Sequence, residues 1–101
     1  MLKINVLEFE HKILDGSIPS NIGSLQSLQV LDDSQNWLVG EISQKLGGMK
    51  QLEKLNLSHN NLSSSIPFKF DDIASLASID LSYNELEGPI PNIKAFRIDS
   101  N

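Results

Sequence analysis

Residues Met49 to Pro67 read MKQLEKLNLSHNNLSSSIP and hold the clearest copy of a pattern that recurs every 24 residues along the chain. Five positions of this pattern are apolar in all four copies, and they hold Met1, Leu25, Met49 and Ile73; Ile4, Leu28, Leu52 and Leu76; Leu7, Leu31, Leu55 and Ile79; Leu14, Leu38, Leu62 and Leu86; and Ile18, Ile42, Ile66 and Ile90. Three more positions repeat as Asn36, Asn60 and Asn84, as Gly16, Gly40 and Gly88, and as Pro19, Pro67 and Pro91. Chance would not place these residue types in register, so we predict four related units.

Each unit is predicted to form one short strand followed by a turn. Apolar and polar residues alternate in Leu55–Leu57 and in Ile79–Leu81, which points successive side chains inward and outward on a strand. The Asn after each strand can bond to nearby backbone groups, so stacked units should form an Asn ladder. Proline has no N–H to donate, which favours an extended segment at a sheet edge. Since one unit cannot bury its apolar face alone, stability should come from stacking into a single apolar spine.

The pattern L-x-x-L-x-x-L-x-L-x-x-N-x-L-x-G-x-I-P resembles the leucine-rich repeat, in the variety found in extracellular parts of plant receptor-like kinases and receptor-like proteins. The resemblance implies an α/β-type leucine-rich repeat solenoid. This would be a right-handed superhelix of about four 24-residue repeats, with a short parallel β-sheet on the concave face and a 3-10 or irregular convex side. The expected domain is 1–96, with repeats at about 1–24, 25–48, 49–72 and 73–96, followed by a tail at 97–101.

The segment Ile79 to Phe96, IDLSYNELEGPIPNIKAF, is similar to the last repeat before the membrane in one group of these kinases. The resemblance implies a non-catalytic fragment of a glycoprotein ectodomain at the extracellular face of the plasma membrane. It would recognise a secreted peptide or another receptor ectodomain, in defence or developmental signalling. The alternative is a structural spacer or capping segment of a longer solenoid, with no ligand of its own. The sequence holds no Gly-rich phosphate loop, H-R-D or D-F-G motif, so we expect no kinase activity in this chain.

Composition narrows the range of partners. The 101 residues include eight Lys and Arg against thirteen Asp and Glu, a net charge of −5, which argues against nucleic acid or an anionic membrane surface. Apolar runs are far shorter than the ~20 residues of a membrane-spanning helix, so direct membrane insertion is not expected. Glu8, Glu10, His11 and Asp15 interrupt the region where a signal peptide would need apolar residues, so none is expected in this chain. Without cysteine, no disulfide is expected.

The outward side chains of the predicted strands are the candidate binding residues, because they would line the concave face. They fall in three columns with one lysine nearby: Glu8, Asp32, Asn56 and Asp80; Glu10, Ser34, Ser58 and Ser82; His11, Gln35, His59 and Tyr83; and Lys54. This acidic lining suits a basic or hydroxyl-rich peptide. The alternative is a solvated polar face without a ligand.

Metal, cofactor and enzyme sites are not expected. His11 and His59 would lie roughly 10 Å apart, too far to share a zinc ion whose ligands sit about 2 Å from it. Glu8 and Asp32 leave open a weak calcium site. Serine, histidine and aspartate recur through the repeat itself and do not indicate a catalytic triad. Gly47-Gly48 is expected to form a turn and not a nucleotide cradle.

Two N-x-S sequons make Asn56 and Asn61 glycosylation candidates, if the protein is secreted. A glycan on Asn56 would stand on the concave face and block it. Trp37 is predicted to face outward at a turn, where it either packs over a neighbouring coil or anchors a partner.

Several positions depart from the pattern. Asp33 stands where Phe9, Leu57 and Leu81 stand in the other units, so it should either turn to solvent or be buried with a raised pKa. Lys12 replaces the ladder Asn and has no acceptor to offer. Ser43 and Ser64 are milder replacements of Pro and Gly. Ile93, Phe96 and Ile98 are expected to cover the last unit as a cap, whereas a bare end would expose core and strand edges.

Overall fold

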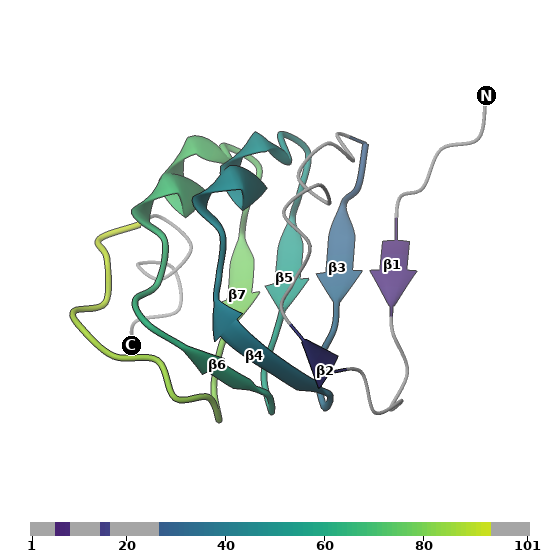
Figure 1. Cartoon of the computed structure of the whole chain (residues 1–101). Helices are drawn as coiled ribbons and strands as arrows, with labels where there is room; N and C mark the ends of the chain where they lie inside the picture. The colour runs from purple at the N-terminus through teal and green to yellow at the C-terminus, as the bar shows by residue number, and fades with distance from the viewer. Residues whose placement is uncertain (1–5, 9–14, 17–26, 94–101) are drawn as a thin grey trace.

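The computed structural model describes residues 6–8, 15–16 and 27–93 (Figure 1). Four short strands form one parallel sheet in chain order: β1 (Val6–Glu8), β3 (Val30–Asp32), β5 (Lys54–Asn56) and β7 (Ser78–Asp80). Leu31 pairs with Leu7 on one side and with Leu55 on the other, and Leu55 pairs with Ile79. Each step equals the 24-residue period of the sequence, so the predicted stacking of units is confirmed over these strands.

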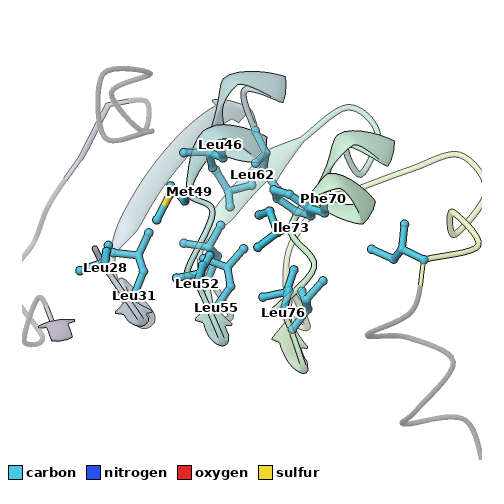
Figure 2. Packing of buried hydrophobic residues seen from close by; sticks show 14 of the residues in the cluster. Leu28, Leu31, Leu46, Met49, Leu52, Leu55, Leu62, Phe70, Ile73 and Leu76 are labelled. Atoms are coloured by element: carbon cyan, nitrogen blue, oxygen red, sulfur yellow. The ribbon is translucent and has the colours of Figure 1, made fainter. Parts of the chain in front are cut away.

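The central residue of each of the strands β3, β5 and β7 points into the core. Leu31, Leu55 and Ile79 are buried, and Leu28, Leu52 and Leu76 lie in the same layers (Figure 2). Burying a leucine side chain completely contributes about 1.5–3 kcal/mol. The recurring aliphatic residues therefore form the predicted continuous spine across the described repeats.

A second parallel sheet, which the sequence pattern did not predict, follows the turns. It contains β2 (Asp15–Gly16), β4 (Trp37–Glu41) and β6 (Asn61–Ser63). Trp37 is the first residue of β4, so its predicted place in a turn is wrong, although its outward orientation is confirmed by an exposed fraction of 62%. Val39 pairs with Asn61, a step of 22 residues. The two sheets therefore advance along the chain with different registers.

Two 3-10 helices, η2 (Gln44–Gly48) and η3 (Phe68–Asp72), connect the second sheet to the next strand of the first (Figure 1). They confirm the 3-10 character predicted for the side opposite the first sheet. Gly47 and Gly48, where we expected a turn, are the last two residues of the 3-10 helix η2. A Cβ on Gly47 would come within 2.9 Å of the carbonyl oxygen of Lys69, so close packing of η2 against η3 requires glycine there.

The predicted Asn ladder is present in the turns. The Nδ2 group of Asn60 donates to the carbonyl oxygens of Asp33 at 3.0 Å and Leu57 at 3.1 Å, while its Oδ1 accepts from the backbone N–H of Leu38 at 3.0 Å. Asn84 repeats these bonds one unit later. One side chain thus satisfies backbone groups of its own repeat and of the preceding one, which holds neighbouring repeats in register.

Asp33 is buried, with 7% of its surface exposed, so the second of the two outcomes predicted for it is correct. Its Oδ1 accepts a hydrogen bond from Asn36 Nδ2 at 2.9 Å. Burial raises the pKa of the Asp33 carboxyl, the neighbouring Asp32 raises it further, and the bond from Asn36 opposes the shift. The Oδ1 atom of Asn36 is buried without a hydrogen-bond partner.

The last described residues depart in part from the predicted spine. Ile90 is 72% exposed, so its predicted place in the apolar core is wrong, because no further described repeat packs over it. Ile93 is buried, which agrees with its expected covering role. Lys12, Phe96 and Ile98 lie outside the described residues, as do Glu10 and His11 among the binding candidates.

Candidate recognition surface

The outer face of the first sheet brings together most of the predicted binding residues. Lys54, Asp80 and Ser82 are exposed, as are Gln35, His59 and Tyr83, whereas Asp32, Ser34 and Asn56 are half-buried. Glu8 lies in β1, and its backbone pairs with Asp32. Val30 and Ser78 share the outward position of Lys54 in neighbouring strands, and the sequence reasoning missed both. The alternation within each strand would have been enough to find them.

Asp32, Asn56 and Asp80 of the first column are each hydrogen-bonded to the serine two residues later. Asp32 Oδ1 accepts from the backbone N–H of Ser34 at 3.0 Å and from its Oγ at 2.7 Å. The same pair of bonds joins Asn56 to Ser58 and Asp80 to Ser82. Short polar side chains form such turns readily. One oxygen of each carboxylate or amide therefore maintains the turn.

Ser58 is the clearest correction to the predicted site. Only 4% of it is exposed, and its hydroxyl donates to Asn56, so it lies inside the turn and does not face a ligand. Ser82 makes the same bonds in the last turn but is exposed. The predicted serine column is thus a structural feature of the repeat.

Asp80 places a stable negative charge on the last strand. The hydroxyl and then the backbone N–H of Ser82 lower the pKa of its carboxyl, burial acts in the opposite direction, and the nearby His59 lowers it slightly. Because Asp80 is exposed and ionised, it is available to a cationic group in solution.

The third column has an unusual backbone. Gln35, His59 and Tyr83 have φ values of 57°, 56° and 57°, in the left-handed region that residues other than glycine rarely occupy. This conformation costs roughly 1–2 kcal/mol for such residues. The neighbouring turn bonds maintain it in three successive repeats, so the three side chains project at the same place from each turn.

An aromatic stack follows from this geometry. The rings of His59 and Tyr83 lie 4.3 Å apart at an interplanar angle of 13°. Tyr83 is 74% exposed, so its ring also presents free surface.

A groove of about 440 Å³ borders this stack, between the turns and the second sheet. Its lining consists of Asn36, Trp37, His59, Asn60, Asn61 and Tyr83. A second hollow, of about 380 Å³, lies at the last described repeat and is lined by Asp80, Tyr83 and apolar residues that include Ile79 and Ile90. Trp37 and the aromatic stack thus share one concave feature that the sequence did not reveal.

The described residues contain no cluster of three or more His, Cys, Asp or Glu side chains suited to hold a metal ion. Nor, over the same residues, is any helix long and apolar enough to cross a bilayer.

The two sequons differ in their surroundings. Asn56 is half-buried and bonded to its own sequon serine, whereas Asn61 and Ser63 are both exposed on β6.

The sequence model described as "Leucine rich repeat" matches residues 36–86, which hold two of the turns and both well-formed ladder asparagines. The chain belongs to the leucine-rich repeat family. No curated protein sequence matches it significantly.

Solved structures extend this leucine-rich repeat assignment to plant receptors. The ectodomain of the membrane receptor kinase GASSHO1/SCHENGEN3 from Arabidopsis thaliana, in complex with CASPARIAN STRIP INTEGRITY FACTOR 2, is 37% identical over 86% of this chain and 10% of that chain, with a TM-score of 0.83. The Arabidopsis receptor kinase HAESA, in complex with the peptide hormone IDA and the co-receptor SERK1, is 40% identical over 76% of this chain and 13% of that chain, with a TM-score of 0.73.

A plant ice-binding protein is also similar, with 31% identity over 81% of this chain and 27% of that chain and a TM-score of 0.77. The leucine-rich repeat chain thus spans between about a tenth and a quarter of these solved chains. Because proteins of different function share this fold, the fold alone does not identify the function of this chain, which depends on the residues at its surface.

Proposed function

We propose that this chain is a non-catalytic recognition module of a plant receptor ectodomain, which binds a secreted basic peptide or another receptor ectodomain. The observation that carries the proposal is the row of Gln35, His59 and Tyr83, which three turns hold at the same place beside the Asp32 and Asp80 carboxylates. The likeness to receptor kinases crystallised with a peptide hormone and a co-receptor supports it.

The proposal includes the architecture expected from the sequence. About four 24-residue repeats form a right-handed superhelix over residues 1–96, followed by a tail at 97–101, and the outer face of the first sheet is concave. In the parent receptor this module stands at the extracellular face of the plasma membrane and acts in defence or developmental signalling. The register of β1, β3, β5 and β7 supports the repeat length.

Electrostatics favour a basic partner. The chain carries a net charge of −5, and Asp32 and Asp80 lie on the proposed face, where Lys54 is the one lysine or arginine among the described residues of the three strands β3, β5 and β7. Complementary charge accelerates association and excludes partners of the wrong sign more than it raises affinity. The exposed ring of Tyr83 supplies the apolar contact area that binding hot spots often contain.

A structural role as a spacer is the second candidate. Its support is that the first-column oxygens and serine hydroxyls are already bonded within their own turns. A spacer would use these groups only for folding and would bind neither peptides nor receptors.

Binding measurements distinguish these two functions. The probes are a panel of short basic peptides, acidic peptides of equal length, and the SERK1 ectodomain, measured by biolayer interferometry at two salt concentrations. We expect basic peptides or SERK1 to bind, and Tyr83→Ala to weaken that binding at least about tenfold, which corresponds to about 1.4 kcal/mol. Asp80→Asn should weaken it a few-fold, in keeping with about 0.2–1 kcal/mol for an exposed charge pair.

The Asp80→Asn variant suits this test because Asn56 already occupies the same position in the preceding repeat and bonds to its serine in the same way. Glu41→Gln is the matched control, since it removes an exposed charge from the second sheet. Equal losses in Asp80→Asn and Glu41→Gln would contradict the proposed face, and absence of binding to every probe would favour the spacer.

A further inference from the structure

We propose that Asn61 carries an N-linked glycan whose first N-acetylglucosamine packs in the groove against Trp37. This inference rests on the extracellular location in the proposed function, because only an exported chain meets the glycosylation machinery. It gives the aromatic groove an occupant that is part of the same molecule.

Asn61 is the better placed of the two sequon asparagines. In β6, Asn61 and Ser63 are exposed while Leu62 between them is buried, so the side chains of Asn61 and Ser63 point outward from the edge strand of the second sheet. Glycans are bulky and need such a surface. Asn56, in contrast, is half-buried in the first sheet and bonded to a buried serine.

The groove begins at the attachment point. β4 and β6 lie side by side as parallel strands (Figure 1), and Asn61 pairs with Val39. Trp37 is two residues before Val39 on the same exposed face of β4. Both Trp37 and Asn61 line the groove, together with the stacked rings of His59 and Tyr83. A sugar attached at Asn61 therefore starts within this lining.

The chemistry of the lining suits a pyranose ring. One face of N-acetylglucosamine carries mainly C–H groups, which pack on aromatic rings, while its hydroxyl and acetamido groups bond to water and to amides. Trp37 is 62% exposed, so the sugar would cover apolar ring surface that is otherwise in water. The groove of about 440 Å³ is within the range of about 300–1,000 Å³ of small-molecule sites.

Covalent attachment makes a weak contact effective. A free monosaccharide must overcome the entropy of association, whereas a tethered one acts at an effective concentration of about millimolar or more.

In the attachment step, Asn61 Nδ2 attacks C1 of the first sugar of a lipid diphosphate-linked oligosaccharide. The C1–N bond forms, the C1–O bond breaks, the lipid diphosphate leaves, and the nitrogen loses one proton.

The test uses the full chain secreted from a eukaryotic cell line that makes only high-mannose glycans. All variants carry Asn56→Asp, which removes the other sequon and keeps the turn acceptor that Asp32 and Asp80 provide in neighbouring repeats. Mass spectrometry should find one glycan, at Asn61, and none in the Ser63→Ala variant. Endoglycosidase H then leaves a single N-acetylglucosamine on Asn61.

Trp37 reports on the contact, because it is the only tryptophan of the chain. If the sugar covers one face of the indole, the acrylamide quenching constant should fall to about half of its value in Ser63→Ala. The single sugar should also raise the melting temperature, and this rise should disappear in Trp37→Asn, which carries at position 37 the residue type of Asn61. A double-mutant cycle of this kind isolates the sugar–indole contact.

An unmodified Asn61, or a modified Asn61 with unchanged quenching of Trp37, would overturn the inference. The proposed function fails by a different result, the absence of binding to peptides and SERK1, which none of these measurements uses. The two proposals can therefore be refuted separately.

Discussion

Replacing Asp33 with leucine should stabilise the protein at neutral pH. The position lies in the apolar core, and the next repeat has the fully buried Leu57 there. Asp33 instead buries a carboxylate beside Asp32, which raises its pKa. Asp33→Leu should therefore stabilise the fold in two ways, because it removes the buried carboxylate and adds apolar contacts.

The size of the effect follows from two opposing contributions. A buried leucine side chain contributes about 1.5–3 kcal/mol relative to an exposed one. Losing the bond from Asn36 Nδ2 to Asp33 Oδ1 costs roughly 0.5–1.5 kcal/mol, although Nδ2 keeps its bonds to the carbonyl oxygens of Asp33 and Ser34. Relief of the buried charge adds to the gain. We expect a net stabilisation of about 1–3 kcal/mol, or at least about 4 °C in melting temperature.

The stabilisation by Asp33→Leu should depend on pH, whereas the simple filling of space in the core would not. The folded-state pKa of Asp33 lies above its ordinary value of 3.8, so the folded chain binds more protons than the unfolded chain in that interval. The contribution of the protonated carboxyl is thus fully present below pH 3.8 and is lost as the pH rises through the folded-state pKa. The advantage of Asp33→Leu should accordingly be smallest at low pH and grow toward neutrality.

Thermal unfolding followed by circular dichroism between pH 3 and pH 7 measures this difference. Asp33→Asn is the control, because it keeps the shape and an acceptor for Asn36 but cannot titrate, so it should lose the pH dependence without gaining the leucine contacts. A melting temperature unchanged by Asp33→Leu would refute the buried placement. An advantage that is equal at low and neutral pH would refute the role of the charge.

Three further substitutions test the framework, each by chemical denaturation. Asn60→Ala should destabilise by about 2–4 kcal/mol, because it removes the acceptor of the Leu38 N–H and the amide group that donates to three carbonyl oxygens. A loss below about 1 kcal/mol would mean that water replaces the ladder. Ser64→Gly should stabilise by up to about 1 kcal/mol, since Ser64 has φ of 67° where both neighbouring repeats have glycine. A lower stability of this variant would show that other contacts of Ser64 already offset the backbone strain. Gly47→Ala should lower the free energy of unfolding by about 1–3 kcal/mol, because the added Cβ would meet the Lys69 carbonyl oxygen at 2.9 Å. Wild-type stability of this variant would mean that η3 can shift without an energetic cost.

The first sheet, the apolar spine and the Asn ladder could all be predicted, because the residues that form them recur with the same 24-residue period. Leu31, Leu55 and Ile79 recur at the spacing that the strands themselves adopt, so sequence register and strand register coincide. The second sheet has no such signal. Its strands pair with a step of 22 residues, and β4 contains Gly40, so neither the period nor β-propensity indicates it.

The binding face was predicted by position but not by chemistry. Alternation along each strand identifies which side chains face outward, yet it says nothing about the hydrogen bonds that they make. The spacing of Asp32 and Ser34 was visible as an Asx-turn signal and would have shown that the serines stabilise turns. The left-handed backbone of Gln35, His59 and Tyr83 has no consistent residue-type signal, because only histidine among them is enriched in this region and none of them is glycine.

Differences among the repeats indicate where recognition can vary. In three successive repeats, Asp32, Asn56 and Asp80 are short side chains whose oxygen accepts from the serine two residues later, so these turns restrict which residues the position tolerates. The left-handed position imposes one backbone conformation on glutamine, histidine and tyrosine alike, and all three side chains are exposed. A position whose backbone is fixed but whose side chain has no part in the turn can change its chemistry without changing the fold. Specificity for a partner should therefore reside in this column more than in the acidic one, and substitutions there should alter binding while leaving the unfolding free energy nearly constant.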